Sequence, residues 1–226
     1  MLHSVQSLHL LLTHRTIESG MLYFFCEVFT PANPKNYLCD MRIAILVWGS
    51  LYWDKRNLET TDEWFYDGPV LPIEFARISN GNRLTLVIKP AFDNVITLYA
   101  ISAHDTLAAA RENLRSREGT ENVNNIGFID FTTNTQQVRQ ANAFMIDILS
   151  QWNTERNFDA IIWSDFSPRF SDAINQQFTL QNVITFIDNL PEAEKRSALQ
   201  YIRNTPHQIN TRFRNAIEQR FEEAYL

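Results

Sequence analysis

One stretch of the sequence decides the fold: Ile43-Ala44-Ile45-Leu46-Val47-Trp48-Gly49-Ser50-Leu51-Tyr52-Trp53. Its apolar run, residues 43–47, is typical of a buried strand. The run leads directly into Gly49-Ser50, where a glycine lets a ligand approach the backbone closely and successive N–H groups can cradle an anion or a carboxylate. The stretch therefore predicts a buried strand that ends either in a ligand-binding turn or in a plain structural turn.

Strand patterns continue from residue 41 to about residue 101. Apolar and polar residues alternate around 73–78 and 84–88, and β-branched and aromatic residues fill 95–101. Asn80-Gly81-Asn82 lies between the first two segments and supplies turn residues. We therefore expect a hairpin at this position.

The periodicity becomes helical at residue 105. A helix over 105–118 is predicted by apolar residues at spacings of three and four, with Asp105 or Thr106 as its cap and Gly119 as its stop. The elements expected after it are a short strand (126–131), an amphipathic helix (135–152), a buried strand (159–163) and three helices in the C-terminal part.

Three segments follow from this patterning. Residues 1–40 are weakly patterned and contain the breaker segment 30–34, so we expect an N-terminal extension that is loosely ordered. Residues 41–174 carry the strands and form the expected main domain. Residues 175–226 are expected to be a helical extension packed on it.

Composition excludes several classes of function. The formal net charge of −6 argues against a nucleic-acid partner, because that affinity depends on clustered Lys and Arg. The six glycines have neither dinucleotide-binding nor P-loop spacing. Two cysteines and five scattered histidines suggest neither a metal site nor a disulfide framework, which favours a cytoplasmic location. The apolar run 8–12 is far shorter than the ~20 residues of a membrane span, so no membrane association is expected.

Two short motifs resemble those of the γ-glutamylcyclotransferases. That family has an early strand followed by Tyr-Gly-Ser-Leu, and this chain has Trp48-Gly49-Ser50-Leu51, with a tryptophan in place of the tyrosine. The family also has a helix that ends in Leu-x-x-Arg-Glu or a similar motif, whose glutamate is the catalytic acid and base. Here the helix ends in Leu114-Arg115-Ser116-Arg117-Glu118-Gly119. The resemblance covers residues 41–131, with both motifs in family order.

The resemblance implies an α+β fold, namely a small, mostly antiparallel β-barrel with flanking helices and a helical C-terminal extension. It implies a lyase, independent of cofactors and metals, that cyclises a small γ-glutamyl amide or peptide to 5-oxoproline and releases the amine. The catalytic residue would be Glu118. The substrate-binding residues would be Val47, Trp48, Gly49, Ser50, Leu51 and Tyr52.

Helical spacing gives Glu118 independent support. It follows Leu114 by one turn and so lies on the apolar stripe of its helix, where the carboxylate projects toward the core. The alternative is a surface glutamate paired with Arg111 or Arg115.

The departure at Trp48 also leaves open a catalytically silent member of the same fold that acts as a small-molecule or protein binding module. Hydrolysis or aminoacyl transfer on related amides is a third alternative. Oligomeric state is not predicted.

Overall fold

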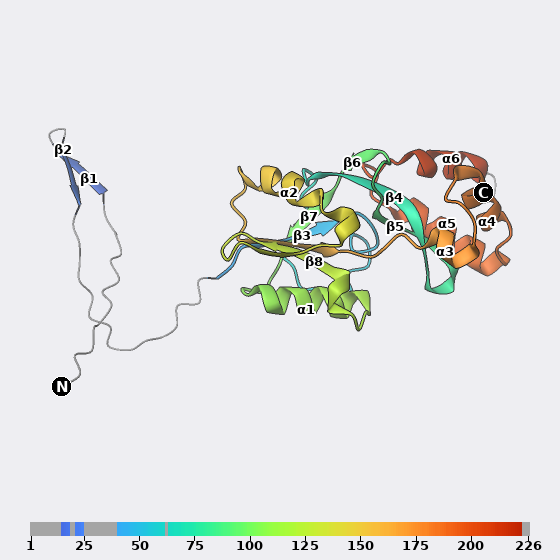
Figure 1. Cartoon of the computed structure of the whole chain (residues 1–226), viewed down its shortest axis with the longest axis horizontal. Coiled ribbons are helices and arrows are strands. Elements are labelled where there is room, and N and C mark those ends of the chain that lie inside the picture. Colours follow the sequence, from blue (N-terminus) through green and yellow to red (C-terminus); the bar gives the residue numbers. More distant parts are fainter. Residues whose placement is uncertain (1–14, 19–20, 25–39, 62, 223–226) are drawn as a thin grey trace. The chain divides into compact units, whose positions relative to one another are not determined.

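The computed structural model describes residues 15–18, 21–24, 40–61 and 63–222 (Figure 1). The chain divides into two units, Met1–Leu38 and Cys39–Leu226. In the first unit, strands β1 (Arg15–Glu18) and β2 (Met21–Phe24) pair antiparallel. The expectation of loose order over residues 1–40 otherwise falls almost entirely on residues outside the described ranges.

A five-stranded sheet forms the centre of the second unit. Its strands in spatial order are β7 (Leu98–Ile101), β3 (Ile43–Val47), β10 (Ala160–Ser164), β8 (Ile126–Asp130) and β9 (Thr135–Gln137). β3 and β10 run parallel, and the other neighbours run antiparallel. Every residue of β3 is buried, as the apolar run predicts for a strand covered on both faces. Helices α1 (Leu107–Glu118) and α2 (Met145–Asn153) lie on opposite faces of this sheet (Figure 1).

Helix α1 begins and ends at the expected residues. The Thr106 side chain accepts a hydrogen bond from the Ala109 N–H, which satisfies one of the free donors of the first turn. Gly119 ends the helix with φ at 63°, a left-handed conformation that favours glycine. The predicted helix over 105–118 is therefore confirmed to within two residues, and its last turn presents Arg117 and Glu118.

The second sheet has three strands in the order β5 (Arg83–Ile88), β4 (Val70–Ser79) and β6 (Asn94–Ile96), all paired antiparallel. A 3₁₀ turn over Asn80–Asn82 connects β4 to β5, with Gly81 at φ 70°. This confirms the predicted hairpin.

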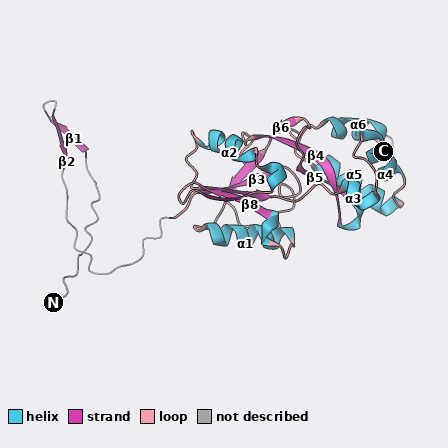
Figure 2. Cartoon of the chain, in the orientation of Figure 1, coloured by secondary structure: helices cyan, strands magenta, loops and turns pink. Residues whose placement is uncertain are grey.

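Four helices follow β10 and gather around the hairpin of β4 and β5 (Figure 2). They are α3 (Phe170–Ile174), α4 (Leu180–Asp188), α5 (Glu192–Asn204) and α6 (Arg212–Arg220). α5 packs on β5, and α3 and α6 pack on β4. The three helices expected in the C-terminal part are confirmed as α4, α5 and α6, of which α5 and α6 contact the smaller sheet.

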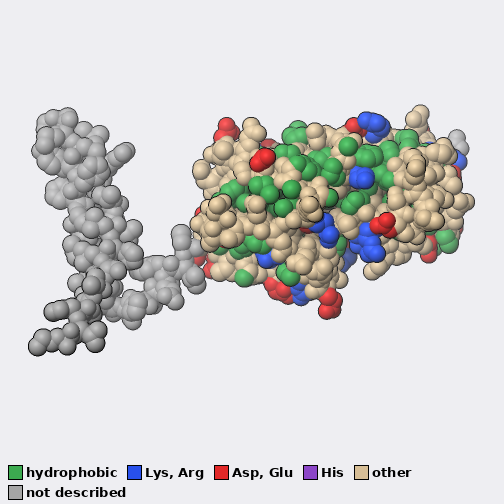
Figure 3. Space-filling view, viewed as in Figure 1, with side chains coloured by type: hydrophobic (Ala, Val, Ile, Leu, Met, Phe, Trp, Pro, Cys, Tyr) green, Lys and Arg blue, Asp and Glu red, His purple; other side chains and the backbone are tan. Residues whose placement is uncertain are grey.

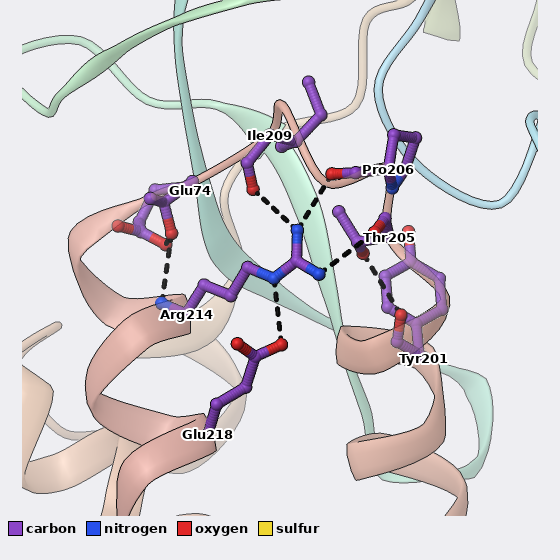
Figure 4. Close-up of polar contacts among 8 residues, drawn as sticks. Glu74, Tyr201, Thr205, Pro206, Ile209, Arg214 and Glu218 are labelled. Atoms are coloured by element: carbon purple, nitrogen blue, oxygen red, sulfur yellow. Dashed lines mark hydrogen bonds and ion pairs between the residues drawn. The ribbon is translucent and has the colours of Figure 1, made fainter.

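Buried polar groups hold the last two helices together. The Arg214 guanidinium donates to the carbonyl oxygens of Thr205, Pro206 and Ile209 and to the Glu218 carboxylate (Figure 4). These bonds satisfy the charge of a side chain that is almost completely buried. They fix the loop between α5 and α6, and with it the end of α5 that carries Tyr201.

The expected α+β class is confirmed, whereas the expected barrel is wrong for the part of the chain that the structure describes. The strands there form separate sheets that do not close. Thr97 separates β6 from β7, because its N–H and its hydroxyl both bond to the Pro69 carbonyl. The outer edge of β7 is then occupied by Phe65, which forms an isolated bridge to Tyr99.

The expected helix over 135–152 begins only at Met145. Its first residues form β9, because Asp130 accepts bonds from the N–H groups of Thr132 and Thr133 and so stabilises a tight turn after β8. Asn134 completes that turn with φ at 54°. Hydrogen bonds of this kind between a side chain and the nearby backbone compete with helix formation, and here they stabilise the hairpin of β8 and β9 instead.

Candidate functional site

A cavity of about 590 Å³ lies where the two sheets and the C-terminal helices meet. Its walls come from the turn after β3, the end of α1, the hairpin of β4 and β5, the segment after β10, and α5. The residues that line it include Trp48, Gly49, Ser50, Leu51, Arg77, Arg83, Arg117, Glu118, Ser164, Arg169 and Tyr201. Segments far apart in the sequence therefore share one concave surface, which is the usual form of a small-molecule site.

Glu118 lies in the last turn of α1, and its side chain is 15% exposed. Its Oε1 accepts a hydrogen bond of 2.7 Å from the Ser164 hydroxyl at the end of β10. The same oxygen lies 3.3 Å from a guanidinium nitrogen of Arg117. The carboxylate is therefore directed to the cavity wall rather than to Arg111 or Arg115, which bond elsewhere. This favours the first of the two orientations predicted for it.

Arg117 joins the two motifs on which the resemblance depends. One of its nitrogens donates to the Ser50 hydroxyl at 3.1 Å and to the Asp54 carbonyl at 2.7 Å. Burial lowers the pKa of Arg117, and the Glu118 carboxylate opposes that shift. Its Nε is buried and has no hydrogen-bond partner among the described residues. Arg117 thus holds the end of α1 against the turn after β3.

Gly49 is required by the close approach of Tyr201. A Cβ at this position would lie 2.6 Å from the Tyr201 hydroxyl oxygen, which is too close for any side chain. The turn is closed by bonds from the Tyr52 N–H to the Gly49 carbonyl and from the Asp54 N–H to the Ser50 carbonyl. The glycine therefore admits a phenol from α5, and a ligand is not needed to explain it.

Tyr201 is buried where α5 meets the turn. Burial, together with the nearby Glu118 carboxylate, raises the pKa of Tyr201 to about 12, although backbone hydrogen bonds to Leu86 and Ser50 oppose the shift. Its hydroxyl is therefore protonated at neutral pH. The hydrogen bond to Ser50 also occupies part of the turn backbone that was expected, from the sequence, to bind an anion or a carboxylate.

The structure brings most of the predicted site residues together. Trp48, Gly49, Ser50, Leu51 and Glu118 line the same cavity.

Val47 and Tyr52 are not among the residues that line it. Val47 is completely buried at the end of β3. The Tyr52 hydroxyl lies 3.1 Å from that of Tyr66.

Three neighbours of Glu118 and Gly49 were not predicted, namely Arg117, Ser164 and Tyr201. Arg117 could have been identified, because it precedes Glu118 within the same motif. Ser164 and Tyr201 reach the site only through the pairing of β10 with β3 and through the packing of α5 on β5. No local sequence signal distinguishes them.

Within the described ranges, no group of three or more His, Cys, Asp and Glu side chains is arranged to hold a metal ion. In that same part of the chain, no helix combines the length and the apolar character needed to cross a membrane. Comparisons with protein-family models, curated proteins and solved structures found no match to this chain. The relation to the γ-glutamylcyclotransferases therefore stays a prediction that rests on the two motifs.

Proposed function

We propose that this protein cyclises a small γ-glutamyl amide or peptide to 5-oxoproline and releases the amine, as the resemblance to the γ-glutamylcyclotransferases implies. The observation that carries the proposal is the position of Glu118. Its carboxylate and the Gly49-Ser50 turn line one cavity, and Arg117 bonds to both motifs. Two motifs distant in the sequence thus meet where a substrate could touch both.

The reaction needs only positioning and proton transfer. The α-amino nitrogen of the substrate forms a bond to its own γ-carbonyl carbon, and the bond from that carbon to the amide nitrogen breaks. The α-ammonium group gives up two protons in total, and both end on the leaving amine, so neither water nor a cofactor is consumed. Holding the γ-glutamyl chain bent keeps the α-amino nitrogen next to the γ-carbonyl carbon, which lowers the entropic cost of reaching the transition state. One carboxylate can carry the protons.

Glu118 is the proposed proton carrier. Its bond to Ser164 and its contact with Arg117 fix the carboxylate at the wall of the cavity. As a carboxylate it takes a proton from the α-ammonium group, and it then delivers a proton to the leaving nitrogen. Both steps require this side chain to lie within hydrogen-bond reach of two substrate nitrogens.

Tyr201 is the proposed donor to the oxygen of the tetrahedral intermediate. Its oxygen already interacts with the backbone of Ser50 and Leu86, and its own proton is available because its pKa is about 12. A preorganised hydrogen-bond donor stabilises charge as it develops on the carbonyl oxygen. The cytoplasmic location expected from the cysteine content belongs to the same proposal.

A catalytically silent binding module is the second candidate. One observation favours it: the Tyr201 hydroxyl already engages the backbone of Ser50, which reduces the cradle available to a substrate carboxylate. A module of this kind would bind a γ-glutamyl compound without releasing 5-oxoproline. The two candidates therefore differ in product formation and agree in ligand binding.

The test is 5-oxoproline release, measured by mass spectrometry, from γ-glutamyl dipeptides, glutathione and γ-glutamyl amines. We expect turnover by the wild-type protein and a loss of ~10²- to 10⁴-fold in Glu118→Gln, the usual effect of removing a proton-transfer group. Glu121→Gln is the matched control, because Glu121 is an exposed carboxylate at the same cavity. Undiminished turnover in Glu118→Gln would refute the assignment. Ligand binding without product in the wild type would establish the binding module.

A further inference from the structure

The hairpin of β4 and β5 presents two arginines on one face. Arg77 lies opposite Thr85, and Ser79 lies opposite Arg83, in the antiparallel register. Side chains two residues apart on a strand share a face, so all four point the same way. All four also line the cavity described above. Arg77 and Arg83 are thus diagonal neighbours across the hairpin, a distance at which long side chains interact.

Arg169, between β10 and α3, adds a third guanidinium to this wall. Burial lowers the pKa of Arg77, and the positive charges of Arg169 and Arg139 lower it further, while Glu118 opposes the shift. The Arg77 side chain donates to the Ser167 carbonyl and lies over the Phe166 ring, so its position is fixed without a counter-ion. The Arg77 guanidinium therefore lies within the electrostatic influence of two other arginines, of which Arg169 is exposed.

The three arginines lack carboxylate partners among residues 40–61 and 63–222. Arg56 pairs with Asp54, and Arg117 pairs with Glu118, but Arg77, Arg83 and Arg169 form no ion pair in that part of the chain. The Arg83 Nε is buried and has no hydrogen-bond partner there. A buried donor without a partner is costly and indicates a group that something else satisfies.

The charge of this wall contrasts with that of the whole protein. The chain carries a net charge of −6, yet the cavity has arginines at positions 56, 77, 83, 117 and 169 against Glu118 and Glu121. Basic side chains also gather toward the middle of the face drawn in Figure 3, where acidic ones are more dispersed. A concentration of positive charge inside a cavity attracts anions of a size that fits the cavity.

We propose that Arg77, Arg83 and Arg169 form a binding site for a small-molecule oxyanion that carries at least two negative charges, as phosphate or carboxylate groups. Guanidinium groups bind both kinds of oxygen through paired, charge-assisted hydrogen bonds. The cavity volume of about 590 Å³ fits a small molecule. The site does not depend on proton transfer by Glu118, so this inference goes beyond the proposed function.

The test is isothermal titration calorimetry of the full chain with pyrophosphate and with citrate at constant ionic strength, and with chloride as the reference anion. We expect saturable binding of at least one polyanion and none of chloride. Tighter binding of pyrophosphate would assign phosphate groups, and tighter binding of citrate would assign carboxylates. Absence of binding by both polyanions would overturn the proposal.

Variants locate the site. Arg83→Gln and Arg169→Gln should each weaken polyanion binding about 10- to 100-fold, the effect of losing hydrogen bonds to a charged group. Both are expected to fold, because neither side chain forms an ion pair in the described part of the chain, and far-ultraviolet circular dichroism checks this. Arg196→Gln is the control, since Arg196 is 70% exposed on α5 and does not line the cavity. Equal affinities in all four proteins would place the anion elsewhere and overturn the proposal. Because no γ-glutamyl substrate is used, this result is independent of the cyclisation assay.

Discussion

The contact between Gly49 and Tyr201 makes a specific prediction about two substitutions. In Gly49→Ala the new Cβ would lie 2.6 Å from the Tyr201 hydroxyl oxygen, so the phenol or the turn must shift. Overpacking of this kind costs about 1–3 kcal/mol of unfolding free energy. The next atom of the ring, Cζ, is 3.7 Å from that Cβ, which is ordinary van der Waals contact. Removing the hydroxyl therefore removes the clash.

Tyr201→Phe alone should also cost about 1–3 kcal/mol, because the backbone groups of buried Leu86 and half-buried Ser50 lose a hydrogen-bond partner. In the double variant Gly49→Ala/Tyr201→Phe, the alanine should add almost nothing to the cost of the phenylalanine. We expect a coupling free energy of about 1–3 kcal/mol between the two positions, favouring the double variant.

Urea denaturation of the four proteins measures this coupling. The denaturant slopes should agree, so that differences in midpoint report stability. If the two single costs add to within about 0.5 kcal/mol, the glycine does not serve to admit the phenol, and the reasoning is refuted. A Gly49→Ala protein as stable as the wild type would refute it equally.

Two further predictions concern other buried groups. Trp48, at the cavity wall, stands where the γ-glutamylcyclotransferase motif has a tyrosine, so under the proposed function the cyclisation rate of Trp48→Tyr should equal or exceed that of the wild type; a large loss would show that the indole itself is required. Burial raises the pKa of Glu74 above its ordinary value, more than its hydrogen bonds from Phe75, Thr211 and Phe213 lower it. The folded protein then holds this proton more tightly than the unfolded chain, so the stabilisation is complete below the ordinary carboxyl pKa and is lost as pH rises through the raised pKa. Glu74→Gln should remove that decline in urea titrations carried out at increasing pH above the ordinary carboxyl pKa, and parallel stability curves for the two proteins would contradict the assignment.

Local sequence patterns predicted the elements whose stability is local. The hairpin at Asn80-Gly81-Asn82 and the helix that ends at Gly119 follow from turn and cap residues that act within a few positions. The helix expected over 135–152 was wrong in its first half, because the turn held by Asp130 outweighs the apolar spacing. The barrel was wrong because Thr97 divides one apolar run between two sheets, a result of its bonds to the distant Pro69.

The parts of the candidate site that lie within a single sequence motif were predicted, and the parts that depend on tertiary packing were not. The turn at Gly49 and the carboxylate of Glu118 were found from their motifs, and both line the cavity. Tyr201 was not predicted, because its place depends on how α5 packs on β5. The arginine wall was also not predicted. Arg77 and Arg83 share a face through the register of the hairpin, which shifts between Glu74 and Arg77, and an alternating sequence pattern does not predict such an irregularity.

The role of Glu118 is tested most directly by a crystal structure of the Glu118→Gln variant with a γ-glutamyl amide bound. The variant cannot carry the proton, so the substrate should remain intact. We predict a bent γ-glutamyl chain in the cavity beside Gly49 and Ser50, with its α-amino nitrogen about 2.6–3.2 Å from the side chain at position 118. A substrate bound outside this cavity, or one whose α-amino nitrogen lies beyond the reach of position 118, would contradict the proposed chemistry.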